Sequence, residues 1–387
     1  MDLEERTFGQ WWFEHDARVV VPIGALREFA EQALEAAGAT ADDARFIAGV
    51  LMSKTIQGDH QRGIDNLRTM LSAARAGEVD LRPDIRVVRE TAATALVDGG
   101  PRASSYLVGR AAMDLAITKA LDAGVGWVAA RSPAAILTAH VQQAVERGCI
   151  GLAMTQSYPT VAPFGGRGPM LGNAPVAVGI PTRDHDPFIL DLSLTQTSSS
   201  GVKLAAREET PLRPGFILDE LGNPTLDALD YPARGFETHS RQRARGTLTT
   251  LGDSHKGYAL VLAVGLLTTI LPIADAAWEV DEIGQGLPLD GRYGAVFGAI
   301  DPDAFDPDGD VPARVDGFLD AVKASPRRDD VNEILYPGET SQRLRAERER
   351  AGICTIPSEQ LDDLVALAAE TGVPLAVVAE PAQPDDR

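Results

Sequence analysis

The longest apolar run in the chain extends from Ala259 to Leu271, includes two threonines and ends at Pro272. It is too short to span a bilayer and is typical of a helix packed inside a protein. Proline cannot continue a helix, so we expect the helix to end there. The run therefore predicts a buried helix, and the rest of the chain has to form a core that covers it.

The chain is long and apolar enough for such a core. It has 387 residues, of which 44% are hydrophobic, enough for one large or two ordinary domains. The formal net charge of −20 opposes binding to nucleic-acid phosphates or anionic membranes. The densest basic cluster, Arg241 to Gly246, has three arginines in a polar segment and indicates a solvated loop. We therefore predict neither a nucleic-acid partner nor a membrane partner.

The number of cysteines and the composition of the first residues indicate in which cell compartment the protein is expected. Cys149 and Cys354 are the only cysteines, which argues against a disulfide scaffold and fits a reducing environment. The first fifteen residues, MDLEERTFGQWWFEH, are charged where a signal peptide would need an apolar core. We expect a cytoplasmic protein.

Periodicity predicts a mixed α/β chain. The aromatic-rich residues 1–20 are expected to form a docked arm, and residues 376–387 a flexible tail. Between them, long Gly- and Pro-rich or polar loops span residues 159–181 and 207–250, and long loops often carry sites. Helices are predicted over residues 24–38, 40–56 (capped by Thr40), 66–78, 104–124, 138–148, 311–325, 339–352 and 358–372, and strands over 85–90, 93–99, 125–130 and 150–156.

Few short motifs carry chemistry. The GVGWV at Gly124 follows a helix rather than a strand and lacks the third glycine of a Rossmann fingerprint. HExxH, CxxC, Walker and nucleophile-elbow patterns are absent, so we predict no metal site and no P-loop chemistry. The Gly-rich stretch Phe164–Pro175 either approaches a phosphate or only makes turns. His255 and Lys256 precede the apolar helix, where a cation at a helix N-terminus favours an anion.

The order of segments resembles the type-2 malate/L-lactate dehydrogenase family, which includes ureidoglycolate dehydrogenase, diketogulonate reductase and cyclic-imine reductases. The resemblance extends from about Val21 to Val373. It is carried by RAGEVDLRP, ALDAGVGWVAARS, VAPFGGRGPMLGNAPVAVGIP, FILDLS, ILDELGNPT, HKGYAL, FGAIDPDAF and EILYPGE.

This resemblance implies an α/β, non-Rossmann fold with a largely antiparallel sheet domain flanked by helices from both chain ends. We expect a helical, substrate-side domain over residues 21–130 and 305–375, and a β-rich, cofactor-type domain over residues 131–304. The family also implies a homodimer with the nicotinamide cleft near the interface. In this chain, Arg62 and residues 165–175 would line that cleft.

The catalytic signatures of the family are altered. Where relatives carry DSHGVxRxxxY, ungapped alignment places Gln61 at the serine and Arg62 at the histidine, with Asn66 and Met70 further along. The second signature, an Asn-His pair, falls at SPAAIL, which has no imidazole. Arg62 cannot act as a general acid, although it can clamp an anion. A gapped alignment would instead place His60 at the histidine.

Other residues of the site are carried over from the resemblance. Asp191 is retained and either orients the substrate or caps a strand end. His140, on the helix after the second signature, is expected to be a surface histidine. A lysine usual in the family appears as Gly201, with Lys203 nearby. The cofactor-binding residues implied are Gly172, Asn173, Ala174 and Pro175, where relatives have GTNP, together with His255, Lys256, Gly257, Gly338 and Glu339.

Three functions are compatible with this pattern. The first is a divergent NAD(P)-dependent oxidoreductase acting on a small anionic keto acid, hydroxy acid or imine. In the second, the pocket is retained for a non-redox reaction on a bound small molecule. The third is a non-catalytic binding subunit. The persistence of the whole scaffold favours the first.

Overall fold

The computed structural model describes residues 18–59, 62–132, 135–207, 209–231, 246–274, 293–307, 309–377 and 380–381. The chain packs as two compact units, one formed by Met1–Arg82 with Glu339–Arg387 and the other by Pro83–Gly338. His60, most of the N-terminal arm, the arginines of the cluster at 241–245 and residues 382–387 lie outside the described ranges.

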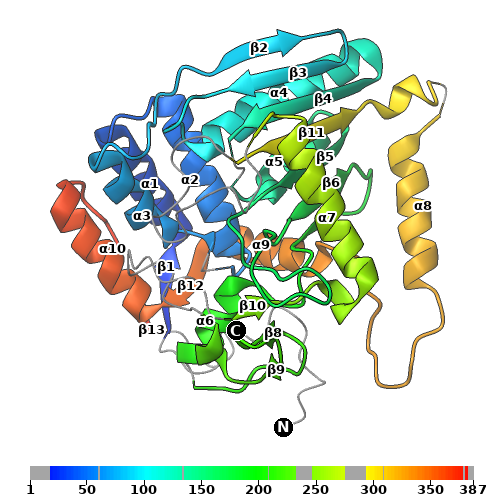
Figure 1. The fold of residues 1–387 in the computed structure, drawn as a ribbon. Helices are drawn as coiled ribbons and strands as arrows, with labels where there is room; N and C mark the ends of the chain where they lie inside the picture. The colour runs from blue at the N-terminus through cyan, green and yellow to red at the C-terminus, as the bar shows by residue number, and fades with distance from the viewer. Residues whose placement is uncertain are drawn as a thin grey trace. The chain divides into compact units, whose positions relative to one another are not determined.

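The first unit combines the two ends of the chain (Figure 1). Its small sheet has the order β12-β1-β13, with β1 antiparallel to both neighbours. Residues 18–20 and 380–381, which the sequence analysis placed in the arm and the tail, form parts of these strands. The elements are β1 (Arg18–Pro22), α1 (Ile23–Ala36), α2 (Ala41–Ile56), α3 (Asn66–Arg75), α9 (Glu339–Ala351), β12 (Ile353–Pro357), α10 (Ser358–Thr371) and β13 (Glu380–Pro381).

Sequence patterns explain the helices of this unit. The apolar residues of α1 recur at helical spacing, and Leu26, Phe29 and Leu34 are among those buried. Thr40 caps α2 as predicted, because its hydroxyl accepts a hydrogen bond from the Asp43 backbone NH at 3.1 Å. Acids in the first turn of α2 complement the helix dipole.

The second unit is built on a seven-stranded sheet with the order β2-β3-β4-β11-β5-β6-β7. Only β3 and β4 are parallel, so the predicted largely antiparallel sheet is confirmed. Its strands are β2 (Arg86–Glu90), β3 (Thr94–Asp98), β4 (Val125–Arg131), β5 (Ile150–Thr155), β6 (Val176–Ile180), β7 (Phe188–Leu192) and β11 (Ala295–Ile300).

Helices pack on both faces of this sheet. Helices α4 (Ser105–Ala123) and α5 (Leu137–Glu146) share one apolar core with strand residues such as Phe297. Helix α7 (His255–Ile270) belongs to a second core with Val296. That core also includes residues of α6 (Ser199–Arg207) and of the small sheet of β8 (Ile217–Leu218), β9 (Pro224–Thr225) and β10 (Thr247–Leu248).

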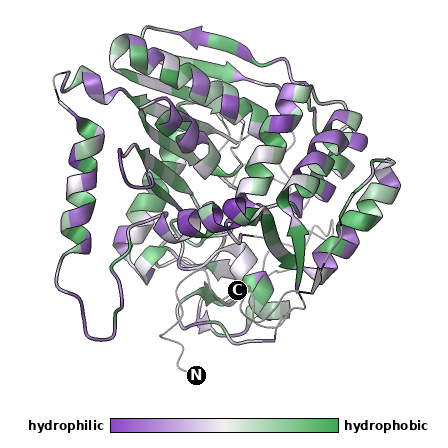
Figure 2. Cartoon of the chain, turned by 180° about the vertical axis from the view of Figure 1, so that it is seen from behind, coloured by the Kyte–Doolittle hydropathy of each residue, from purple (hydrophilic) through white to green (hydrophobic). Residues whose placement is uncertain are grey.

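Helix α8 (Val311–Lys323) follows the sheet in sequence and mixes hydrophilic and hydrophobic residues along its length (Figure 2). Asp316 on α8 is buried and accepts hydrogen bonds from the backbone NH groups of Arg183, Asp184 and His185. These bonds hold the pKa of Asp316 below its ordinary value, although burial acts in the opposite direction. A buried carboxylate thus joins α8 to the turn between β6 and β7.

The boundaries of the two units differ from those expected. The sequence analysis divided the chain at 130/131 and 304/305, whereas the structure divides it at 82/83 and 338/339. The reason is strand pairing: β2 and β3 join the sheet through β4, which pairs with β11. The substrate-side and cofactor-side roles of the two units stay predictions.

The prediction of a buried helix at 259–271 is wrong in one respect. The helix forms and ends near Pro272, but only one side of it is buried. Leu260, Leu266, Leu267 and Ile270 on the other side are exposed.

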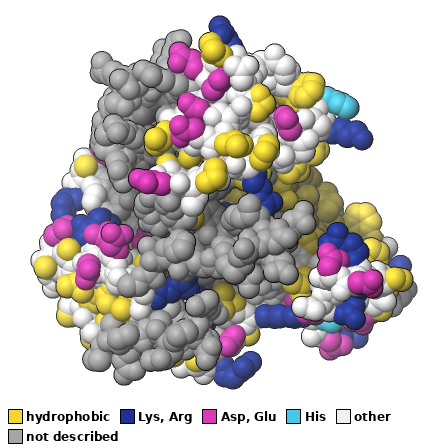
Figure 3. Space-filling view, turned by 90° about the horizontal axis from the view of Figure 1, so that it is seen from below, with side chains coloured by type: hydrophobic (Ala, Val, Ile, Leu, Met, Phe, Trp, Pro, Cys, Tyr) yellow, Lys and Arg dark blue, Asp and Glu magenta, His cyan; other side chains and the backbone are white. Residues whose placement is uncertain are grey.

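None of the described helices is long and apolar enough to cross a membrane. Cys149 and Cys354 are both free and buried, in accord with the expectation of no disulfide. On the face shown in Figure 3, acidic and basic side chains are interspersed among hydrophobic ones.

Candidate functional site

In the first unit, a short turn joins α2 to α3 and carries Arg62. Arg348 of α9 donates hydrogen bonds to the carbonyl oxygens of Thr55 and Ile56, at 3.4 and 3.1 Å. The Thr55 hydroxyl accepts from the Ile64 backbone NH at 2.9 Å. A Cβ at Gly63 would lie 2.4 Å from this hydroxyl, so only glycine fits. The residues before and after Arg62 are therefore fixed by hydrogen bonds, at Thr55 and Ile56 on one side and at Ile64 on the other.

Arg62 itself forms an ion pair with Asp59, with 2.7 Å between Nε and Oδ2. Its side chain is 53% exposed, so an anion in solution can reach the guanidinium. Exposed pairs of this kind are weak, about 0–1 kcal/mol, and exchange readily. The structure thus places Arg62 where it can bind an anion, while its role stays a prediction.

In the second unit, Asp191 of β7 caps a helix. Its carboxylate accepts hydrogen bonds from the backbone NH of Thr138, at 3.3 Å, and from the Thr138 hydroxyl. Thr138 stands in the first turn of α5, where a negative charge is favourable. The observed cap is thus at a helix start rather than a strand end, and a substrate contact by Asp191 stays a prediction.

His140 is a correction to the sequence analysis, because it is fully buried rather than on the surface. Burial lowers the pKa of His140 to about 4, against the opposing effects of its hydrogen bond to Gln143 and the charge of Asp191. The ring occupies the space left by Gly109 of α4, where a Cβ would lie 2.4 Å from Nε2. A neutral, enclosed imidazole is not a ready proton donor at neutral pH.

The segment Gly172–Pro175 forms a tightly anchored loop. Ser157 donates its hydroxyl to the Asn173 side-chain oxygen at 2.7 Å and accepts from the Asn173 backbone NH at 3.0 Å. A Cβ on Gly172 would lie 2.5 Å from the Ser157 carbonyl oxygen. Ala174 is buried with a φ of +45°, in the left-handed region that non-glycine residues rarely adopt.

The N-terminus of α7 presents the side chains of His255 and Lys256. Ser254 caps the helix by accepting from the Gly257 backbone NH at 3.4 Å, and His255 and Lys256 are exposed. A Cβ on Gly257 would lie 1.9 Å from a carbonyl oxygen, so this position also requires glycine. Phe164 meets the ring of His255 edge-on with centroids 6.4 Å apart.

Backbone hydrogen bonds join these segments within the second unit. The Leu194 NH, just beyond β7, donates to the Asn173 carbonyl at 3.0 Å. The Leu251 NH, just before α7, donates to the Leu194 carbonyl at 2.9 Å. The structure therefore brings together the loop at Asn173, the segment after Asp191 and the start of α7.

The remaining predicted residues are placed as follows. Gly338 has a φ of +91°, which favours glycine, and it precedes α9. Glu339 is buried and forms an ion pair with Arg343 one turn along α9. His60 is outside the described residues, and the predicted cleft shared by Arg62 and residues 165–175 stays a prediction.

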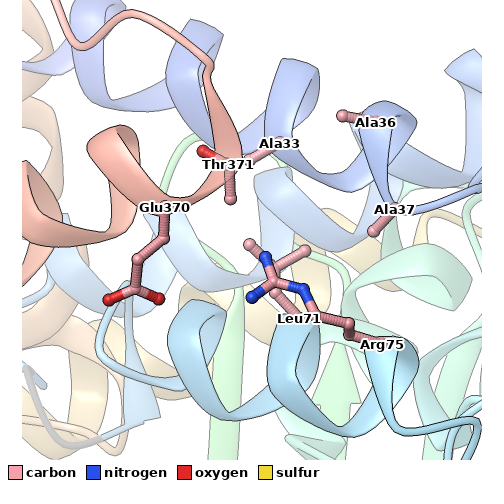
Figure 4. A pocket seen from close by; sticks show the side chains of 7 residues that line it. All are labelled: Ala33, Ala36, Ala37, Leu71, Arg75, Glu370 and Thr371. Carbon is pink, nitrogen blue, oxygen red and sulfur yellow. The ribbon is translucent and has the colours of Figure 1, made fainter.

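A cavity of about 280 Å³ lies in the first unit (Figure 4). Arg75 and Glu370 line it from opposite sides, and Leu71 of α3, Thr371 of α10 and the alanines at the end of α1 complete the lining. The cavity lies at the C-terminal turns of α1, α3 and α10, where the helix dipoles favour a cation. It contains none of the predicted site residues, and we assign no substrate to it.

Sequence reasoning missed Thr138, Ser157 and Arg348. Thr138 at the start of a predicted helix was a detectable signal, because threonine there is a common capping residue. Ser157 and Arg348 had no local signal, since each acts on a segment distant in sequence.

The sequence is similar to those of known dehydrogenases. Residues 21–365 match the family model described as malate/L-lactate dehydrogenase. L-sulfolactate dehydrogenase of Methanocaldococcus jannaschii is 31% identical over 339 residues, 87% of this chain and 90% of the relative. Malate dehydrogenase of Pyrococcus horikoshii is 30% identical over 91% of this chain and 96% of the relative.

Solved structures show the same fold. The sulfolactate dehydrogenase from Methanocaldococcus jannaschii superposes with a TM-score of 0.80 at 28% identity, covering 92% of this chain and 98% of the other. The largely antiparallel seven-stranded sheet is the non-Rossmann fold of these dehydrogenases. The chain belongs to the malate/L-lactate dehydrogenase family.

Proposed function

We propose that this protein is an NAD(P)-dependent oxidoreductase that acts on a small anionic keto acid, hydroxy acid or imine. The observation that carries the proposal is the hydrogen-bonded assembly of the Asn173 loop, the segment after Asp191 and the start of α7. The relatives include dehydrogenases of sulfolactate and malate, and a Δ1-pyrroline-2-carboxylate/Δ1-piperideine-2-carboxylate reductase of Pseudomonas putida, 30% identical over 69% of this chain and 75% of the relative.

The residues at the start of α7 fit a dinucleotide. His255 and Lys256 are exposed at a helix N-terminus, where backbone NH groups and positive charge suit a phosphate. Phe164, which is 55% exposed beside His255, offers an apolar face to a flat ring. These three residues would hold the cofactor together with the Gly172–Pro175 loop. A bound nicotinamide supplies or accepts the hydride.

Residues of the chain would then bind and orient the substrate. Arg62 would bind its anionic group, since a guanidinium forms two parallel hydrogen bonds with a carboxylate or sulfonate. Without substrate the guanidinium pairs with Asp59, and the substrate anion would compete with this carboxylate for it. Asp191 would orient the reacting end, and Thr138 fixes its carboxylate.

A second candidate is binding without redox chemistry, by a repurposed pocket or a non-catalytic subunit. The observation in its favour is that His140 is buried with a pKa of about 4. The ungapped alignment implied by the family resemblance also puts Arg62 in place of a histidine. Proton transfer by a positioned group contributes about a hundred- to ten-thousandfold to a rate, so its loss would slow the ordinary reaction.

Calorimetric titration with NADH and NADPH tests the proposal. We expect one of them to bind, and Lys256→Gln to weaken binding about tenfold through loss of a charged phosphate contact. Arg314→Gln is the matched control, since Arg314 is an exposed cation of the same unit that pairs with Asp306. Oxidation of the bound cofactor by keto acids or cyclic imines would then be followed by absorbance. Failure of both cofactors to bind would contradict the proposal, and binding without turnover would favour the second candidate.

A further inference from the structure

The cavity of the first unit has opposite charges on facing sides (Figure 4). Arg75 stands in the last turn of α3, and Glu370 stands in the last turn of α10. Ala33 and Leu71, which also line the cavity, are 1% and 2% exposed, so its inner part is apolar and buried. A concave apolar surface with a few charged groups is the usual form of a small-molecule site.

The two charges face the cavity without pairing with each other. Glu370 pairs with Arg68 of α3 through Oε1, at 2.8 Å from Nη1, and its Oε2 has no hydrogen-bond partner in the described part of the chain. Among the same residues, the guanidinium of Arg75 forms no ion pair and no hydrogen bond. One carboxylate oxygen and one guanidinium are therefore available to a ligand.

The helix ends make the Glu370 side of the cavity attractive to a cation, because the carbonyl groups at a helix C-terminus carry partial negative charge. Helices α1 and α10 both end at the cavity without a basic residue in the last turn, and Glu370 adds a full negative charge to the end of α10. Arg68 offsets this charge from one side only. Helix α3, by contrast, ends with Arg75. The cavity thus has one side that suits an ammonium group and one that suits a carboxylate.

The volume of the cavity limits the size of the ligand. About 280 Å³ is the volume of roughly nine water molecules in the liquid, and it lies just below the usual range of about 300–1,000 Å³ for drug-sized ligands. Thr371 donates its hydroxyl to the Leu367 carbonyl oxygen at 2.8 Å, so its methyl group is left to face the cavity (Figure 4). The lining therefore suits a short aliphatic chain beside the two charges.

We propose that this cavity binds a free α-amino acid with a short aliphatic side chain. Arg75 donates hydrogen bonds to the carboxylate of the ligand, and the ammonium group of the ligand donates to Oε2 of Glu370. The aliphatic side chain lies against Ala33 and Leu71. The ligand is bound and not transformed. None of these residues belongs to the proposed cofactor or substrate site, so binding here does not depend on the proposed function.

Calorimetric titration of the full chain with L-leucine tests the site. Leucine is expected to bind and to raise the melting temperature by a few degrees, since a ligand of the folded state alone stabilises that state. Two matched probes each remove one charge: 4-methylpentanoate lacks the ammonium group, and 3-methylbutylamine lacks the carboxylate. Each should bind at least tenfold more weakly, because a charge-assisted hydrogen bond is lost. No binding of leucine, or equal binding of the three compounds, would overturn the proposal.

Substitution of the charged residues locates the bound leucine. Arg75→Gln and Glu370→Gln should each weaken its binding at least tenfold, and Arg75→Gln should leave the melting temperature of the ligand-free protein nearly unchanged, since Arg75 is exposed. Arg27→Gln is the matched control, because Arg27 is an exposed arginine of α1 outside the cavity. Arg62→Gln alters the proposed substrate site and should bind leucine like the wild type. Loss of binding in Arg62→Gln with full binding in Arg75→Gln would place leucine elsewhere and overturn the proposal.

Filling the cavity provides a test that leaves its charges in place. Ala36 lines the cavity from the last turn of α1 and is exposed, so Ala36→Leu adds an apolar side chain there at little cost to folding. Leucine binding should fall at least tenfold in this variant, whereas Ala36→Ser, which changes the size little, should bind like the wild type. Unchanged binding of leucine by Ala36→Leu would contradict the assignment of the ligand to this cavity.

Discussion

The imidazole of His140 meets the phenyl ring of Phe297 edge-on, with ring centroids 5.3 Å apart and the planes at 88°. Both side chains are fully buried, one on α5 and one on β11. Desolvation holds the pKa of His140 at about 4, so the ring packs as a neutral group. Protonation would place a charge between two helices and a sheet.

Stability should therefore depend on pH through His140. The ring binds a proton near pH 6.5 in the unfolded chain but only near pH 4 in the folded chain. Between these values the unfolded chain holds more protons, so stability is complete above about pH 6.5 and falls toward pH 4. The loss is on the order of 3 kcal/mol. Urea unfolding at pH 7 and pH 4.5 should show a smaller loss in His140→Gln, and equal losses would contradict this account.

The hydroxyl of Thr55 should stabilise the turn before α3. It accepts from the buried Ile64 NH and donates to the Leu51 carbonyl oxygen. Thr55→Val keeps the shape but leaves the NH without its acceptor, so we expect a loss of about 1–3 kcal/mol in the free energy of unfolding. Thr55→Ser retains the hydroxyl and should lose less. Urea denaturation compares the two, and a smaller loss in the valine variant would refute the role of the hydrogen bond.

Arg62 is expected to act on ligand affinity rather than on stability. Its ion pair with Asp59 is exposed, so Arg62→Ala should change the melting temperature little. If Arg62 binds the substrate anion, the same variant should raise the dissociation constant about tenfold or more, a loss of roughly 1.5–3 kcal/mol. Calorimetric titration of both proteins with a small carboxylate or sulfonate measures the dissociation constant. Unfolding without a change in affinity would show that Arg62 is a structural residue.

Two further variants sharpen the test of Arg62. Asp59→Asn removes the competing carboxylate and should strengthen anion binding. Arg62→His introduces the histidine that the ungapped family alignment implies, and should add keto-acid reductase activity with NADH or NADPH if only the proton donor has been displaced. The absorbance of the reduced nicotinamide measures the activity. A variant that binds the cofactor but stays inactive would show that loss of the proton donor is not the only change.

Ala174 should tolerate glycine better than any branched residue. Its φ of +45° is left-handed, a conformation that glycine adopts readily and alanine only at a cost. Ala174→Val adds branching at a buried, left-handed position and should cost about 2–3 kcal/mol. Ala174→Gly relieves the backbone while losing one buried methyl, so its effect should stay within about 1 kcal/mol. Thermal or urea unfolding of both variants provides the comparison, and equal effects would contradict the backbone argument.

Much of the fold was predictable from local sequence. The Thr40 cap, the strands at 85–90 and 125–130 and the end of α7 near Pro272 all depend on neighbouring residues. Capping, alternation and proline geometry act within one or two turns, so a single segment contains the information. The family pattern added the sheet type and the order of the site segments.

The candidate site was predictable only in its parts. The sequence identified the Gly172–Pro175 loop, Asp191 and the start of α7 as separate segments. The hydrogen bonds of Leu194 and Leu251 that join them link segments far apart in the sequence, which a local pattern cannot predict. Ser157 and Arg348 were missed for the same reason.

Tertiary packing decided what periodicity could not. His140 has the local sequence of a surface residue, but Gly109, on another helix, leaves the space that encloses its ring. The apolar run was predicted to be a buried helix. In the structure one side of it lies in the core and the other in water, because the sheet covers only the side with Val261 and Val264. Local sequence determined where elements begin and end, since those forces are short-range. Burial was decided by residues far apart in the chain, because it depends on which surfaces meet in space.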